Sequence, residues 1–431
     1  MILLVQSAAA SASAFLLVLH CFKKYSHILK NVRMFFDWGV ERILKLMVQC
    51  YSVISHLDAM GRLLSEKLGE RALIVAEIGK NFIQTEEERP VLEYLESAKE
   101  LARLAKAAGA DAVKFQTHNV EDEVLNIDFD SPHFKGKSRY QWVKRNTEAT
   151  PLKEFWPPLK RYCDQIGILF FSTPMSRGAA MKLEKVGVPW WKVASSDILD
   201  FPMLDFMARS GKEIMIPSGM STLEDVDRCL DFLRRKNASF ILMHAISRYP
   251  YPPEDSNLLT IKFFQKRYPG VKIGFSQNSP WIEPAIAAVA LGARVVEQHF
   301  TTGQDLWGPD HKVSMTPDEF RRMAVAIRRV EGSVQKQQEV LSDPAMQKYM
   351  GREEKFLQEG EVPFRGLFRK SLVASRDLPA GTVLSADDIF AMRPQELIGG
   401  LPSEDYEKIL GKSIRQSLKQ YDPITAASLN P

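Results

Sequence analysis

Residues 109–118 read GADAVKFQTH, a short apolar run that follows a glycine. Ala112, Val113 and Phe115 predict a buried β-strand. Lys114 and Gln116 occupy alternate positions within this strand, so period-two geometry points both side chains to the same face. A lysine inside an apolar strand is unfavourable unless an anion meets it. The stretch therefore predicts a buried strand whose lysine faces either a bound anion or a fixed carboxylate.

Runs of the same kind recur along the chain from residue 73, and helix-like stretches such as 94–109, 222–237 and 283–292 separate them. Alternating strands and helices imply a parallel sheet, and eight such units in about 250 residues predict a closed (β/α)8 TIM barrel. An open doubly wound sheet is the alternative, but no G-x-G-x-x-G follows the first strand, which excludes its dinucleotide-binding form. The predicted strands are residues 73–79, 112–117, 168–174, 190–196, 213–219, 240–247, 272–278 and 294–300.

Composition narrows the class of protein. The chain has 431 residues, of which 45% are hydrophobic and 26% are charged, as in soluble globular proteins. A net charge of +4 is too weak to indicate nucleic-acid binding. The four cysteines are far apart and form no C-x-x-C pair, which argues against a zinc site or a disulfide framework. We therefore expect a cytoplasmic protein.

Four regions differ in their sequence pattern. Residues 1–70 form an N-terminal extension that is first apolar and then amphipathic and helical. No Lys or Arg precedes the apolar part, unlike in a secretory signal, and the part is only marginally long enough to span a bilayer. We expect an appended segment, with membrane association as an unsupported alternative. Residues 71–332 are the predicted barrel, 333–363 a linker, and 364–431 a small β-rich domain with turn chemistry in LPAGTVL.

Polar residues cluster where the predicted strands end, and in a barrel these ends converge on the face that carries the active site. Two lysines from different strands, Lys114 and Lys192, are hard to explain structurally, although ion pairs with Glu77 or Asp197 are the structural alternative. The insertion 118–150 should fold over the mouth as a lid. Its His118 and His133 are expected at the surface, His244 in the core, and His311 in a loop that approaches the site.

Several short motifs then occur in an order that resembles the N-acetylneuraminate (sialic acid) synthase family, whose members carry a C-terminal antifreeze-like (SAF) domain. The resemblance covers about residues 72–431 and implies a TIM barrel followed by a SAF domain. The motifs are AEIG (76–79), GADAVKFQT (109–117), FSTP (171–174), KVASSD (192–197), SGM (218–220), YPYPP (249–253), EQHFT (297–301), GPDHKVS (308–314) and RKSLVASRDLPAGTVLSADDI (369–389).

The resemblance implies a condensation of phosphoenolpyruvate with an N-acetylmannosamine-type N-acyl hexosamine, which gives a nonulosonic acid and phosphate. Glu77 and His299 match catalytic positions. A small trianion needs convergent cations and neutral hydrogen-bond donors, which fits the two lysines. The positions that match the phosphoenolpyruvate site are Lys114, Thr173, Lys192, Ser195, Ser218, Tyr249 and Ser276, and those that match the sugar site are Gln116, Asp197, Asp310 and Arg393.

The resemblance also implies a divalent metal, Mn²⁺ or Mg²⁺, and a domain-swapped homodimer in which Arg393 reaches the site of the partner subunit. His299 matches one metal ligand, whereas Asn278 stands where the family typically has a second histidine. An amide oxygen is a weaker ligand than imidazole but is acceptable to a hard cation. Another departure follows the first strand, where KNFIQ (80–84) adds the cation Lys80 near the mouth.

Three hypotheses follow. The first is an active synthase with an altered sugar acceptor. The second, which Asn278 and the changed loop at 80–84 favour, is a catalytically weakened paralogue that binds a sugar or a partner in surface-polysaccharide biosynthesis. The third is an unrelated barrel aldolase or phosphate-binding enzyme, against which the SAF-like C-terminal region argues.

Overall fold

The computed structural model describes residues 71–127, 129–131 and 134–430. All described residues belong to one compact unit of the chain. The predicted apolar segment and amphipathic helix, and His133, lie outside the described residues. Within the described part, no helix is long and apolar enough to cross a membrane.

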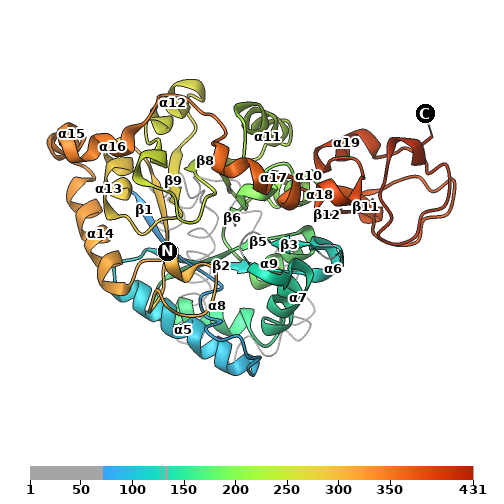
Figure 1. Ribbon diagram of the computed structural model, residues 1–431, viewed down its shortest axis with the longest axis horizontal. Helices are drawn as coiled ribbons and strands as arrows, with labels where there is room; N and C mark the ends of the chain where they lie inside the picture. Colours follow the sequence, from blue (N-terminus) through green and yellow to red (C-terminus); the bar gives the residue numbers. More distant parts are fainter. Residues whose placement is uncertain (1–70, 128, 132–133, 431) are drawn as a thin grey trace, which may run out of the picture. The chain divides into compact units, whose positions relative to one another are not determined.

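Eight parallel strands form one nearly closed sheet, as the alternation of strands and helices predicts (Figure 1). The strand order is β5-β2-β1-β10-β9-β8-β7-β6, and β5 and β6, at the two ends of this order, contact each other. The fold is therefore a TIM-like barrel. The strands are β1 (Leu73–Gly79), β2 (Ala112–Thr117), β5 (Leu169–Pro174), β6 (Trp191–Lys192), β7 (Ile214–Pro217), β8 (Phe240–Ala245), β9 (Ile273–Gln277) and β10 (Val295–His299).

A helix follows each barrel strand, and each helix turns an apolar stripe toward the sheet. In α11 a capping box at Thr222 and Asp225 satisfies the first backbone N–H groups, and Val226, Leu230 and Leu233 are buried at helical spacing. The barrel helices are α5 (Val91–Ala107), α8 (Trp156–Ile166), α9 (Arg177–Val186), α10 (Phe201–Arg209), α11 (Leu223–Arg235), α12 (Thr260–Arg267), α13 (Ile282–Ala290) and α14 (Pro317–Val330).

The insertion after β2 is ordered into small elements at the barrel mouth: α6 (Val120–Glu123), β3 (Asp130–Ser131), β4 (Phe134–Ser138) and α7 (Arg139–Ala149). Residues 333–363, predicted as a linker, carry α15 (Val334–Ser342), α16 (Gln347–Met350) and the start of α17 (Val362–Phe368).

The small C-terminal domain is built on an antiparallel pair, β11 (Ser371–Ala374) and β12 (Ile389–Met392), with short helices α18 (Gln395–Ile398) and α19 (Tyr406–Ile409). Its core contains Leu372, Ile389, Ile414 and Ile424, all fully buried. The end of β12 continues into the insertion, because Arg393 N donates to Glu123 O and Leu125 N donates to Arg393 O, each over 3.0 Å. These backbone bonds fix the position of Arg393 at the barrel mouth.

Candidate active site

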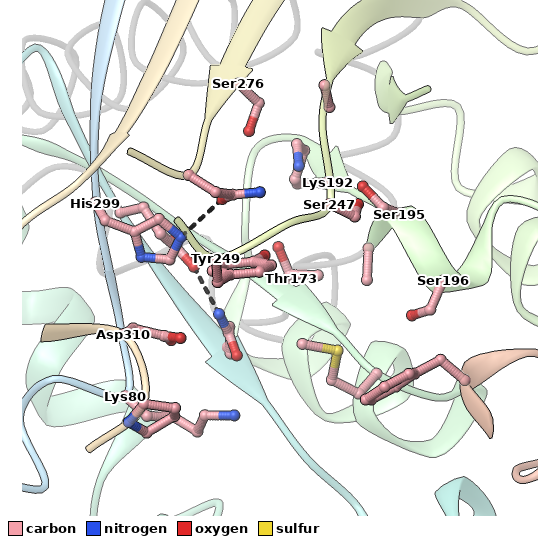
Figure 2. Close-up of a pocket in the computed structure, with 18 of the residues that line it drawn as sticks. Lys80, Thr173, Lys192, Ser195, Ser196, Ser247, Tyr249, Ser276, His299 and Asp310 are labelled. Atoms are coloured by element: carbon pink, nitrogen blue, oxygen red, sulfur yellow. Dashed lines mark hydrogen bonds between the residues drawn. The ribbon is translucent and has the colours of Figure 1, made fainter. Parts of the chain in front are cut away.

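A cavity of about 130 Å³ opens at the carboxyl ends of the barrel strands. Most residues that the sequence predicts for the site line it (Figure 2). These are Glu77, Lys114, Gln116, Thr173, Lys192, Ser195, Tyr249, Ser276, Asn278, His299, Asp310 and Arg393.

Lys114 and Lys192 meet at one carboxylate oxygen of Glu297. Lys114 Nζ lies 3.5 Å and Lys192 Nζ lies 3.4 Å from Glu297 Oε1, and Lys114 Nζ also lies 2.7 Å from Glu77 Oε2. Both lysines and both glutamates are buried and line the cavity. The structural alternative, an ion pair with Glu77, is thus present for Lys114. Both lysines nevertheless face an open cavity.

The pKa values of these groups follow from their unequal surroundings. Burial alone would lower the pKa of Lys114, but Glu297 and Glu77 outweigh it and raise the pKa above its ordinary value. For Lys192 burial prevails over Glu297, and the nearby charge of Lys114 lowers the pKa further. Burial would raise the pKa of Glu297, yet the two lysines hold it well below its usual range. Neighbouring carboxylates therefore stabilise the charge of Lys192 less than that of Lys114. A bound anion would stabilise the charged form of Lys192 more.

Hydroxyl groups surround the lysines. Lys114 Nζ donates to Thr173 Oγ1 over 3.0 Å, and Ser276 Oγ donates to Glu297 Oε1 over 3.0 Å. Ser247 Oγ is buried beside them without a hydrogen-bond partner among the described residues. The SGM turn allows this crowding, since a Cβ on Gly219 would lie only 2.3 Å from Ser247 Oγ. The site therefore offers hydroxyl groups as well as cations to a ligand.

Asn278 and His299 form the candidate metal pair. Asn278 Nδ2 donates to Ile246 O over 2.6 Å, which turns Oδ1 toward His299, and His299 Nε2 lies 3.2 Å from this oxygen. Both side chains line the cavity. In the described part of the chain, no group of three or more His, Cys, Asp or Glu side chains is arranged to hold a metal ion. The pair would fit as two ligands of a hard divalent ion, with water or substrate supplying the others.

Two predicted site residues do not line the cavity. Ser218 is buried between strands, where its Oγ accepts a hydrogen bond from Ala245 N over 3.3 Å. Asp197 lies behind the surface and accepts two bonds from Arg393, over 2.7 and 2.9 Å. The resemblance implied that Arg393 enters a partner subunit's site, whereas here it contacts Asp197 of its own chain.

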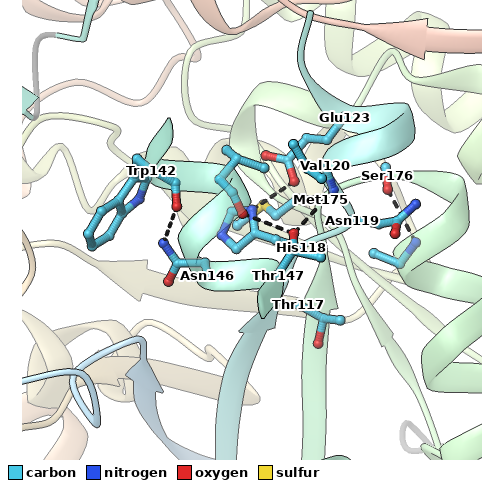
Figure 3. A network of polar contacts seen from close by, with 12 residues as sticks. Thr117, His118, Asn119, Val120, Glu123, Trp142, Asn146, Thr147, Met175 and Ser176 are labelled. Atoms are coloured by element: carbon cyan, nitrogen blue, oxygen red, sulfur yellow. Dashed lines mark hydrogen bonds and ion pairs between the residues drawn. The ribbon is translucent and has the colours of Figure 1, made fainter. Parts of the chain in front are cut away.

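The prediction that His118 lies at the surface is wrong, because its side chain is buried in a polar network (Figure 3). His118 Nδ1 lies 2.7 Å from Glu123 Oε2, and His118 Nε2 lies 3.1 Å from Lys80 Nζ. Burial lowers the pKa of His118 to about 4 although Glu123 favours its charged form, so the ring is neutral at pH 7. It therefore donates from Nδ1 to Glu123 and accepts at Nε2 from Lys80.

The other histidine predictions have different outcomes. His244 is buried in β8 and contacts Ser256 O at 2.7 Å, which confirms it as a core residue. His311 is buried, lies 2.7 Å from Thr301 Oγ1 and does not line the cavity.

Sequence reasoning missed several residues of the site. Glu297 stands two residues before His299 in β10, so period-two alternation places both on the inner face and could have identified it. Arg139 and Trp142 line the cavity from α7, which no strand pattern indicates. Glu361, from the predicted linker, accepts from Met220 N over 2.9 Å and from Ser247 N over 2.7 Å, and so holds two site loops.

Comparison with known sequences decides the family. The model of the NeuB family matches residues 101–339, and that of the SAF domain matches residues 369–430. The chain belongs to the NeuB family. The resemblance seen in the sequence motifs is thereby confirmed, and so is the expected barrel with its SAF domain.

Several relatives of this NeuB-family chain are named as synthases of sialic-acid-type sugars. It is 31% identical to the human N-acetylneuraminate-9-phosphate synthase over 81% of this chain and 90% of that protein. It is also 31% identical to the pseudaminic acid synthase of Helicobacter pylori, over 82% of this chain and 96% of that protein. The crystal structure of the spore coat polysaccharide biosynthesis protein spsE from Bacillus subtilis superposes with a TM-score of 0.64 at 26% identity, and the match covers 84% and 95% of the two chains.

Proposed function

We propose that this protein condenses phosphoenolpyruvate with an N-acetylmannosamine-like amino sugar to give a sialic-acid-type nonulosonic acid and inorganic phosphate. The observation that carries this proposal is the meeting of Lys114 and Lys192 at one oxygen of Glu297, at the wall of an open cavity. A small trianion that enters there gains two buried cations and hydroxyl donors, and such charge-assisted contacts are the strong ones in phosphate recognition.

The reaction forms one carbon–carbon bond and one carbon–oxygen bond, the latter to the oxygen of water, and breaks the carbon–oxygen bond to phosphate. Carbon 3 of phosphoenolpyruvate attacks the aldehyde carbon of the open-chain sugar, and the aldehyde oxygen takes up a proton. Water adds at carbon 2, and phosphate leaves with the electron pair of its bond to that carbon. The two protons of water balance the charge on the former aldehyde oxygen and on the phosphate. Preorganised cations stabilise the charge on the departing phosphate.

The residues of this chain have separate roles in the proposal. Lys114 and Lys192 hold the phosphate and the carboxylate of phosphoenolpyruvate. Thr173 adds a hydroxyl donor to the same anion, and Ser276 holds Glu297 through its hydroxyl group. Glu77 orients the sugar or moves a proton. Two contacts hold its carboxylate in the cavity wall: Oε1 accepts from Gln116 Nε2 over 2.9 Å, and Oε2 pairs with Lys114. A divalent ion held by His299 and Asn278 would polarise the sugar aldehyde when bound.

Phosphoenolpyruvate-dependent phosphate release, with a panel of N-acyl hexosamines and Mn²⁺ or Mg²⁺, tests the proposal. We expect Lys114→Ala to reduce release to background, because the anion loses a buried cation. Lys182→Ala is the matched control, since Lys182 is a partly buried lysine of α9 that does not line the cavity. Unchanged turnover in Lys114→Ala would contradict the proposal.

A second candidate function is binding without turnover, which Asn278 in place of a metal-binding histidine favours. In that case, titration calorimetry would detect binding of the sugar or of phosphoenolpyruvate, but the protein would release no phosphate with any acceptor in the panel.

A further inference from the structure

Two more buried cations, Lys80 and Arg139, face the same cavity. Lys80 follows β1, and Arg139 is the first residue of α7; their relative exposures are 8% and 7%, and both line the cavity. Figure 2 shows Lys80 beside Asp310, at the opposite side of the cavity from Lys192 and Ser276. Lys80 therefore lies apart from Lys192, which the proposed function assigns to phosphoenolpyruvate, and Arg139 is one of the charges that act on Lys80.

The contacts of Lys80 hold its position and leave its charge without a close carboxylate. Its Nζ lies 3.1 Å from His118 Nε2 and 5.3 Å from the ring centre of Trp142. His118 is a neutral acceptor whose other nitrogen binds Glu123, so Glu123 anchors the ring rather than Lys80. No carboxylate oxygen of the described residues lies within 4.0 Å of Lys80 Nζ.

Arg139 likewise has no carboxylate at hydrogen-bond distance among the described residues. Its Nη2 lies 3.8 Å from Glu123 Oε1, which is too long for a hydrogen bond, and its Nε is buried without a hydrogen-bond partner in the described part of the chain. Its guanidinium lies 5.2 Å from the ring centre of Phe368, so aromatic contact supports it as it supports Lys80. By contrast, the other cations of the cavity wall have close carboxylates: Lys114 pairs with Glu77, Lys192 with Glu297 and Arg393 with Asp197.

Burial and neighbouring positive charge act against the charged forms of both side chains. Burial lowers the pKa of Lys80 to about 8, and the charge of Arg139 adds to this effect; burial likewise lowers the pKa of Arg139 to about 10. Two desolvated like charges with unused hydrogen-bond donors form an unfavourable arrangement that a bound anion would relieve.

We propose that Lys80 and Arg139 form a subsite that binds a negatively charged substituent of the acceptor sugar, a phosphate ester or a carboxylate. This inference rests on the proposed function, because it assigns the acceptor to the same cavity. The substituent lies on the wall made by the loop after β1 and by α7, while phosphoenolpyruvate occupies the lysine pair on the other side. The N–H groups of Lys80 and Arg139 then donate hydrogen bonds to the oxygens of the phosphate or carboxylate substituent.

Three forms of one sugar test the subsite: N-acetylmannosamine, its 6-phosphate and its 6-carboxylate. We expect kcat/KM of the wild-type protein to be at least tenfold higher for one charged form than for the neutral sugar, and the better charged form distinguishes phosphate from carboxylate. Lys80→Met and Arg139→Gln should each reduce this ratio at least tenfold, mainly through KM, whereas Lys80→Arg should retain most of it. Lys182→Met is the matched control and should leave the ratio unchanged.

Calorimetric binding of the same three sugars separates this inference from the proposed function, because it needs no turnover. Tighter binding of a charged sugar that weakens in Lys80→Met would support the subsite even if no phosphate were released. A wild-type protein that prefers the neutral sugar in both assays would overturn it. A variant that loses all three sugars equally while Lys80→Arg restores none would do the same, since Lys80 would then act only on the structure.

Discussion

Nη2 of Arg393 donates hydrogen bonds to both carboxylate oxygens of Asp197, over 2.7 and 2.9 Å. Both side chains are buried, and Lys370 Nζ lies 3.4 Å from the same carboxylate. Arg393 of the SAF domain thus forms part of the cavity wall. Asp197, a barrel residue that does not itself line the cavity, holds it there. Because the pair is buried, loss of either partner leaves an uncompensated charge.

A mixture of two inactive variants distinguishes the two ways in which Arg393 can reach a site. Arg393→Met removes the SAF arginine, and Lys114→Ala removes the barrel lysine. The contact within one chain predicts that co-refolded mixtures stay inactive, because every barrel then lacks one of the two groups. Phosphate release restored to about a quarter of the wild-type rate would instead show the domain-swapped homodimer, since half of the dimers would have one complete site.

Glu297→Gln should expose the role of the carboxylate between the lysines. We expect the free energy of unfolding to fall by about 3 kcal/mol, because two buried cations lose a shared partner. Phosphoenolpyruvate should raise the Tm of this variant more than that of the wild type, since its charge replaces the missing carboxylate. Glu331→Gln is the control, as Glu331 pairs with Arg328 outside the cavity. Equal Tm increases in wild type and Glu297→Gln would refute this role.

Asn278→His should strengthen the metal pair. Imidazole is the better ligand for Mn²⁺, so we expect Mn²⁺ to bind at least tenfold more tightly, as measured by the metal that remains after dialysis. Gln277→His adds the same ligand one residue away, where the native side chain contacts Gln298 and does not line the cavity, and should retain no additional metal. A wild-type protein that already retains one equivalent would contradict this expectation.

Lys80→Met should stabilise the free protein, which is the opposite of what a structural lysine would do. Burial moves the pKa of Lys80 from 10.5 to about 8, which corresponds to about 3 kcal/mol against the charged form, and His118 loses a bond of about 1 kcal/mol. Chemical denaturation at pH 7 should therefore show a gain of about 2 kcal/mol. The charged groups that act on Lys80 are Arg139, Asp310, Glu123 and Glu77.

The pH dependence checks the same assignment. Between about pH 8 and 10.5 the unfolded chain binds more protons at Lys80 than the folded one, so wild-type stability rises with pH in this window. The difference between wild type and Lys80→Met should narrow there. Destabilisation by Lys80→Met at pH 7 would show that this lysine supports the fold instead.

The strands were predictable because a parallel barrel buries both faces of each strand, and β1 and β2 match their predicted limits. The run at 190–196 gave only the short β6, because the chain turns into a 3-10 helix at Ser195. The lysine pair was predictable from alternation within strands. The burial of His118 was not, because it depends on Glu123 and Lys80, whose positions are set by an insertion and a loop without a periodic pattern.

The two halves of the cavity come from different kinds of structure. Lys114 and Lys192 project from barrel strands, whereas Lys80 and Arg139 belong to the loop after β1 and to the insertion after β2. A strand residue cannot be re-aimed without a register shift that disturbs the whole barrel, but loops tolerate replacement. Under the proposed function, the choice of acceptor sugar can therefore change while the phosphoenolpyruvate half of the site stays constant, and grafting another insertion onto this scaffold would be a direct way to alter that choice.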